Sequence, residues 1–165
     1  MVMSAFGILW FILIAVLIIG YFALDGFDLG VGVLYPFLGK DERTKMMMIR
    51  SIGPVWDGNE VWLLTAGGAL FAAFPPAYAT CFSGFYLAIM LVLFGLIIRA
   101  VAVEFRGHGE EPAKLWDGCF FIGSLLPALL FGVALGDVLA GIPLNMYGDY
   151  TGNFFGLLTA FGLDC

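Results

Sequence analysis

Acidic side chains occur in two pairs beside the apolar runs of this chain. Asp25 and Asp28 follow the first run, and Asp57 and Glu60 precede the second. The members of each pair are three residues apart, so on a helix they share one face. A carboxylate facing lipid at mid-bilayer costs about 2.5–3.5 kcal/mol, so we expect these groups to face protein, water or one another. Carboxyl groups of unequal pKa at one depth can pass protons along a chain.

One cation is placed to join these acids. Arg99 lies near the end of the third apolar run, at the depth of the carboxylates, and Asp117 begins the fourth. Taken singly, each residue has a structural interpretation, such as a helix-start acid for Asp57 or a snorkelling cation for Arg99. Asp25 can also end the first span in a turn with Gly26. Together, ionisable groups at matching depth predict one functional cluster.

The elements that position these residues are predicted to be membrane-spanning helices. Hydrophobic residues make up 62% of the 165 positions and charged residues 12%, whereas soluble domains carry about 25% charge. A helix needs roughly 20 apolar residues to cross a bilayer. The fold class is therefore all-α, a polytopic four-helix membrane bundle over residues 1–140. The expected spans cover about 2–27, 50–74, 79–104 and 116–139.

The basic residues predict how the bundle is oriented. All seven lie in or beside the first-to-second and third-to-fourth connections: Lys40, Arg43, Lys45, Arg50, Arg99, Arg106 and Lys114. Loops rich in Lys and Arg stay in the cytoplasm. Both termini are therefore expected outside, and residues 141–165 are expected to be an extracytoplasmic connection and the start of a further span.

Metal, haem and nucleic-acid binding find little support in the residues. Cys81, Cys119 and Cys165 form no CxxC pair, and the only histidine, His108, lies in a loop. Membrane haems are commonly held by histidine, so this chain is not expected to carry one. No basic stripe is present that could neutralise nucleic-acid phosphates.

Glycines predict where helices approach closely. Small residues at helix interfaces let backbones come together in the membrane. We expect this role for Gly26, Gly30, Gly32, Gly67 and Gly68.

Four segments resemble subunit II of the cytochrome bd-type quinol oxidases. They are LDGFDLGVG (24–32), SIGPVWDGNEVWLLTAGGALFAAFP (51–75), FSGFYLAIMLVL (82–93) and TGNFFGLLTAFGL (151–163). The resemblance implies a complex that oxidises membrane quinol and reduces dioxygen to water. In such complexes subunit I carries two b haems and haem d, while subunit II binds none and supports haem insertion and stability.

The resemblance also assigns residues. Asp57, in the Trp-Asp-Gly-Asn motif, is implied in a cytoplasmic proton pathway, and Asp28 is the second Asp of the Asp-Gly-Phe-Asp motif. The supporting cluster is Asp25, Trp56, Asn59, Glu60 and Arg99. Position 60 departs from the family, which favours a neutral amide there. No catalytic or metal-binding residue is expected in this chain.

The implied partners follow from the same resemblance. They are the haem-carrying subunit I, membrane lipid, a small single-helix subunit and a chain supplying the other half, since the family has eight spans in this subunit. A non-catalytic quinone is a further expectation. The expected location is a bacterial or archaeal cytoplasmic membrane, crossed several times. Alternatives are a purely structural scaffold and a small proton- or cation-coupled transporter, which the resemblance argues against.

Overall fold

The computed structural model describes residues 4–106, 113–141 and 145, and over these residues the chain is helical without strands. The predicted all-α class is confirmed for this part of the chain. Six helices are present: α1 (Ala5–Leu38), α2 (Glu42–Ile52), α3 (Trp56–Ala73), α4 (Pro75–Gly84), α5 (Tyr86–Phe105) and α6 (Ala113–Ala140).

Three of these helices are long and apolar enough to cross a membrane. They cover Ala5–Leu38, Tyr86–Phe105 and Ala113–Leu139. Helix α3 has 18 residues, which at about 1.5 Å per residue span roughly 27 Å. Its first turns contain Asp57, Asn59 and Glu60, which lower its mean hydropathy and keep it out of this group.

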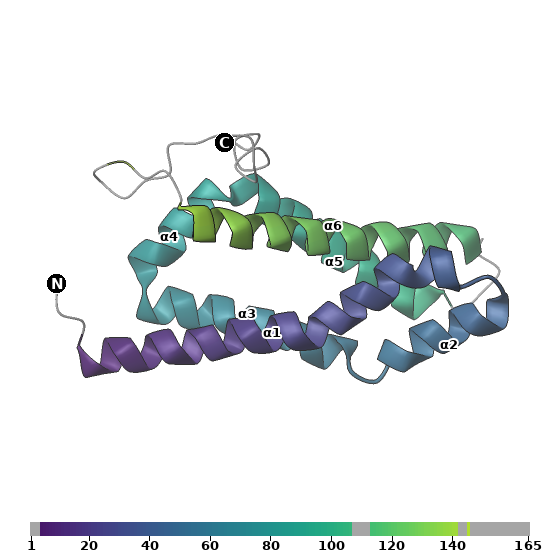
Figure 1. Cartoon of the computed structure of the whole chain (residues 1–165), viewed down its shortest axis with the longest axis horizontal. Coiled ribbons are helices and arrows are strands. Elements are labelled where there is room, and N and C mark those ends of the chain that lie inside the picture. The colour runs from purple at the N-terminus through teal and green to yellow at the C-terminus, as the bar shows by residue number, and fades with distance from the viewer. Residues whose placement is uncertain (1–3, 107–112, 142–144, 146–165) are drawn as a thin grey trace.

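The helices form two packed pairs (Figure 1). Helix α3 runs back along α1, α6 runs back along α5, and α1 also packs against α6. Helix α2 lies at the end of the molecule where α1 finishes, and α4 lies at the opposite end between α3 and α5. The first residues of α1 and the last turn of α6 are both at the α4 end (Figure 1).

Helix α1 is longer than expected, because a span ending near residue 27 continues to Leu38. Asp25 and Asp28 therefore lie in the body of the helix, and no turn forms at Asp25 and Gly26. The helix continues because it carries a buried stripe with alternating steps of four and three residues, the spacing of one helix face. The stripe consists of Tyr21, Asp25, Asp28, Gly32 and Tyr35.

Helix α2 replaces what was expected to be a basic loop. The Asp41 side chain caps it by accepting the backbone N–H of Thr44 at 3.0 Å, a preferred arrangement for a helix start. The expected second span, 50–74, is therefore divided. Its first residues finish α2, the chain turns at residues 53–55, and α3 begins at Trp56.

The expected third span, 79–104, also differs from the structure. Helix α4 begins earlier, at Pro75, where a missing N–H is tolerated in the first turn. The helix is interrupted at Phe85, and α5 begins at Tyr86. Phe85 is buried in the apolar core with Leu29, Val92 and Leu130, so packing of this side chain stabilises the break.

Two glycines bring α5 and α6 into backbone contact. A Cβ built on Gly123 would lie 2.7 Å from the backbone N of Arg99 and 2.7 Å from the carbonyl O of Gly95. A Cβ on Gly95 would lie 2.8 Å from the ring of Pro127. Real Cβ atoms do not approach this closely, so both positions require glycine. This contact holds α5 against α6 at Arg99, whose side chain is buried.

Most of the glycines expected to mediate packing do not do so here. A Cβ on Gly32 would collide with Ser124, as expected of a packing glycine. The others have no atom within 4 Å of a built Cβ: Gly26, Gly30, Gly67 and Gly68. Sequence alone does not say which face of a helix meets a neighbour. The close α1–α3 contact instead lies at Gly20, against the Trp62 ring.

Candidate functional site

A buried guanidinium joins helices α1, α3 and α5 in the half of the bundle nearer α2. Arg99 on α5 is 1% exposed, and its Nη2 donates to Asp25 Oδ1 on α1 at 2.7 Å and to Glu60 Oε1 on α3 at 2.6 Å. Asp25 is completely buried, whereas the Glu60 side chain is 23% exposed. Burying a charge is tolerated only when partners compensate for lost hydration, so each member of this group depends on the others.

A second contact between α1 and α3 lies beside this group. Asn59 Nδ2 donates to Asp28 Oδ2 at 2.8 Å, and Asp28 is 3% exposed. Because Asp25 and Asp28 are three apart and Asn59 precedes Glu60, the four side chains meet across one helix interface. The Arg99 cluster is defined here as Asp25, Asp28, Asn59, Glu60 and Arg99. All five belong to the set that was predicted to lie together, which also included Trp56, Asp57 and Asp117.

Two polar atoms in the Arg99 cluster have no hydrogen-bond partner within the described residues. They are the two remaining donor nitrogens of Arg99, Nε and Nη1, and both are buried. Most buried polar groups in proteins are hydrogen-bonded to protein or to ordered water. The cluster therefore has hydrogen-bonding capacity to spare, which suits it chemically to hold water or a further polar group.

Two predicted site residues lie outside the Arg99 cluster. Asp57 is exposed in the first turn of α3, and its Oδ1 accepts the backbone N–H of Gly58 at 2.7 Å. The preceding Trp56 packs at the edge of an apolar group that contains Ile49 and Ile52 of α2. The two residues mark the start of α3, at the α2 end of the bundle, and the described contacts do not join Asp57 to Arg99.

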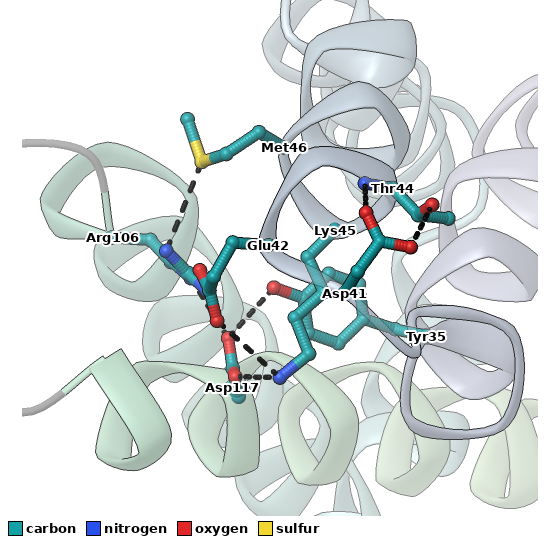
Figure 2. A network of polar contacts seen from close by, with 8 residues as sticks. All are labelled: Tyr35, Asp41, Glu42, Thr44, Lys45, Met46, Arg106 and Asp117. Atoms are coloured by element: carbon teal, nitrogen blue, oxygen red, sulfur yellow. Dashed lines mark hydrogen bonds and ion pairs between the residues drawn. The ribbon is translucent and has the colours of Figure 1, made fainter.

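Asp117 forms a separate cluster, contrary to the expectation of a single one (Figure 2). Its Oδ1 accepts Tyr35 Oη at 2.7 Å and Arg106 Nε at 2.8 Å, and its Oδ2 accepts Lys45 Nζ at 2.6 Å. Arg106 Nη2 also donates to Glu42 Oε2 at 2.7 Å. This Asp117 cluster comprises Tyr35, Glu42, Lys45, Arg106 and Asp117, and connects α1, α2, α5 and α6.

The roles of Tyr35, Lys45 and Arg106 were not predicted from the sequence. The two cations were used only to orient the chain. A signal for Tyr35 was present, because it lies seven residues after Asp28 and so continues the buried stripe of α1. No comparable spacing reveals that Lys45 and Arg106 meet Asp117, since that contact depends on how α2 folds back.

Two charged groups outside the spans have perturbed pKa values. The Thr44 hydroxyl and backbone N–H donate to the charged Asp41 carboxylate and lower its pKa. Burial acts to lower the pKa of Arg106, but its hydrogen bonds to Glu42 and Asp117 outweigh that effect and raise the pKa. Arg106 therefore remains a cation and holds α2 electrostatically.

The described part of the chain contains no evident site for a metal ion. No group of three or more His, Cys, Asp or Glu side chains is placed there to hold an ion. Cys81 and Cys119 are free thiols. His108, Cys165 and the 151–163 segment lie outside the described residues.

The half of the bundle nearer α4 holds an apolar cavity of about 680 Å³. All of the helices except α2 contribute lining residues, among them Ile18, Leu63, Phe82 and Val92. Its lining contains none of the charged residues of either cluster. A cavity of this kind suits an apolar ligand or a lipid chain.

The arrangement is that of a polytopic helical membrane protein with a buried ion cluster between its spans. The family described as cytochrome bd terminal oxidase subunit II matches residues 6–165. The chain belongs to this family.

Curated relatives agree with that assignment. The chain is 52% identical over 163 residues to cytochrome bd-I ubiquinol oxidase subunit 2 of Escherichia coli strain K12, covering 94% of this chain and 42% of the relative. It is 48% identical to a probable cytochrome oxidase subunit 2 of Haemophilus influenzae, with 95% and 43% covered. Cytochrome bd ubiquinol oxidase subunit 2 of Bacillus subtilis is also 48% identical, with 87% and 43% covered. The chain thus spans less than half the length of these relatives.

Proposed function

We propose that this chain acts in a membrane complex that oxidises quinol and reduces dioxygen to water, as a haem-free subunit that supports the haem-carrying subunit. Family membership supports this role, as does the similarity to a ubiquinol oxidase subunit of Escherichia coli. Haems b and d would be bound by subunit I. Further proposed partners are a small single-helix subunit and a chain that supplies the other half.

The proposed membrane arrangement has four crossings by α1, α3, α5 and α6. The roughly 27 Å length of α3 supports its inclusion, and α4 continues it at the far end. Basic residues gather at the α2 end, which we place in the cytoplasm of a bacterial cell. Residues 1–140 would then form the bundle, with residues 141–165 on the outer side.

The proposed chemical contribution is proton uptake from the cytoplasmic side. The main support for proton uptake is a series of polar side chains that follow one another along the α1–α3 interface. Asp57 is exposed at the α2 end, Asn59 bonds Asp28, and Arg99 bonds both Glu60 and the fully buried Asp25. Three carboxyl groups around one cation give the cluster more acidic groups than positive charges, which a proton-carrying site requires.

The test is to replace two carboxylates in the assembled complex. Asp57→Asn and Asp28→Asn keep side-chain volume but remove the titrating oxygen. Each is expected to slow oxygen reduction by roughly tenfold or more, since a positioned acid or base contributes about 10²–10⁴-fold, while the haem spectrum stays unchanged. Asp137→Asn, which alters a buried acid near the far end of α6, is the matched control and should turn over normally.

Two results would redirect the proposal. Loss of the haem spectrum together with activity would make Asp57 and Asp28 assembly residues. Normal turnover in both variants would support a purely structural scaffold. That alternative is favoured by one observation, the pairing of both Asp25 and Glu60 with Arg99, which a structural ion cluster would also show.

A non-catalytic quinone is proposed as a ligand of the apolar cavity. Its volume of about 680 Å³ and its lining from five helices suit a ring with an isoprenoid tail. This role is independent of the proton route, because the cavity lining excludes the Arg99 cluster.

A further inference from the structure

Helix α2 has one face packed on the bundle and one face turned away from it. Ile49 and Ile52 are buried in one apolar group with Tyr35 of α1, Ala102 of α5 and Phe120 of α6. Arg43, Met47 and Arg50 follow one another at steps of four and three, so they form a single stripe. All three are exposed, and the Met47 side chain is 54% exposed. This stripe is called the α2 face.

The Asp117 cluster fixes which way the α2 face points. Lys45 Nζ lies 2.6 Å from Asp117 on α6, and Glu42 Oε2 lies 2.7 Å from Arg106 at the end of α5 (Figure 2). These two ion pairs hold α2 on the side opposite Arg43 and Arg50. The helix therefore cannot roll to bury its arginines without breaking charged contacts to two other helices.

The acids of this segment are already engaged, which leaves its outward cations in excess. The Asp41 carboxylate accepts from Thr44, and the Glu42 carboxylate pairs with Arg106. Within the described residues, the ammonium of Lys40 and the guanidinium groups of Arg43 and Arg50 have no ion pair. Three cations of this segment therefore face outward without a bonded acid among the residues that the structure describes.

The position of α2 matches the headgroup level of a bilayer. It lies beside the end of α1 at Leu38, the end of α5 at Phe105 and the start of α6 at Ala113 (Figure 1). Trp56 begins α3 after the turn at residues 53–55, and Trp116 lies in the first turn of α6. Tryptophan is enriched at the membrane–water interface, so both side chains mark that level beside α2.

We propose that the α2 face, together with Lys40, binds the phosphate headgroup of an anionic phospholipid. Guanidinium groups match phosphate oxygens with two parallel hydrogen bonds. Arg43 lies four residues before Met47, and Arg50 lies three residues after it. The exposed thioether chain of Met47 suits contact with the lipid's glycerol and upper acyl region. Charge complementarity selects the occupant, since a zwitterionic lipid offers no net charge to the three cations.

The test uses the membrane complex purified through this chain and freed of lipid in mild detergent. Titration with phosphatidylglycerol or phosphatidylcholine, followed by native mass spectrometry, gives the affinity for each lipid. Phosphatidylglycerol should bind more tightly. Arg43→Gln should weaken its binding roughly fivefold, and Arg43→Gln/Arg50→Gln should weaken it further, since each cation near an anionic surface contributes about that factor. Lys114→Gln, which removes an exposed cation in the first turn of α6, should leave it unchanged.

Unchanged phosphatidylglycerol affinity in the double variant, or equal binding of phosphatidylcholine, would overturn the proposal. Met47→Cys keeps every charge and covers the case in which the double variant does not assemble. Carrying a photoactivatable cross-linker in native membranes, this cysteine should capture phospholipid. Capture of another polypeptide instead would show that a protein covers the α2 face and would also overturn the proposal.

Discussion

Arg99 organises the polar interior because it is the cation that both Asp25 and Glu60 require. A guanidinium has five N–H donors, and here one terminal nitrogen serves both carboxylates while Nε and Nη1 have no partner in the described chain. Removing one member of a buried ion pair leaves the other uncompensated and typically costs about 3–5 kcal/mol.

Arg99→Leu should therefore be more damaging than Asp25→Asn. The first leaves two carboxylates without their cation, whereas the second leaves Arg99 paired with Glu60. We expect Arg99→Leu to lose about 3–5 kcal/mol of stability and Asp25→Asn to lose less, measured as the fraction of complex that stays monodisperse after heating in detergent. Lys114→Leu removes an exposed cation at the bundle end and should behave as wild type. Equal stability of all three variants would mean that the Arg99 cluster does not hold the helices together.

The Arg99 cluster was largely predictable from sequence, and the Asp117 cluster was not. Asp25, Asp28 and Glu60 are expensive to expose to lipid, so spacing and depth were enough to place them near Arg99. The depth of Asp117 also suggested a buried ion pair, but depth alone does not say which cation on the same side of the membrane is its partner. Asp117 pairs with Lys45 and Arg106, and not with Arg99, because α2 folds back beside it. No local sequence pattern predicts that α2 folds back in this way.

At the scale of elements, α5 and α6 pack together most extensively among the described helices, and this packing sets the position of Arg99. Gly123 lies against the backbone of Arg99 itself. Without a strong hydrophobic force between helices in lipid, close backbone packing is a main source of their association. A methyl group at Gly123 would have to displace backbone atoms and not a flexible side chain.

Gly123→Ala should consequently separate α5 from α6. Overpacking of this kind costs about 1–3 kcal/mol, which would lower the temperature at which the complex loses its native size distribution. Gly118→Ala and Gly132→Ala lie on the same helix with nothing within 4 Å of the added carbon, so they control for the change in helix propensity. A Gly123→Ala complex as stable as these two would show that α5 and α6 can shift apart without penalty.

The boundaries of elements were less predictable than their existence. The Asp25–Gly26 pair suggests a turn, yet the helix continues because its buried stripe extends to Tyr35. The break at Phe85 is equally invisible in an apolar run, since it is stabilised by packing against other helices. Local residue preferences favour an end or a continuation, and tertiary contacts decide between them.

At the scale of the whole molecule, composition was sufficient to predict a membrane bundle because so little of the chain can be placed in water. The number of crossings depends on α3, whose polar start lowers its mean hydropathy. The fold supports a crossing, since α3 runs from the α2 end of the molecule to the α4 end (Figure 1). If α3 crosses, then α2 and α4 lie on opposite sides of the membrane.

Cysteine labelling should place four positions along the chain on alternating sides of the membrane. In a background with the native cysteines replaced, Ser4→Cys and Ala77→Cys should react with an impermeant maleimide in spheroplasts. Ser51→Cys, at the end of α2, and Lys114→Cys should react only in inverted vesicles, because ends rich in Lys and Arg stay in the cytoplasm. All four positions are exposed, so accessibility reports the side and not burial. Labelling of residues 51 and 77 from the same side would remove α3 from the spans. That result would also contradict the proposed entry of protons at Asp57, because an α3 that does not cross the membrane cannot lead from the cytoplasmic surface to the buried Arg99.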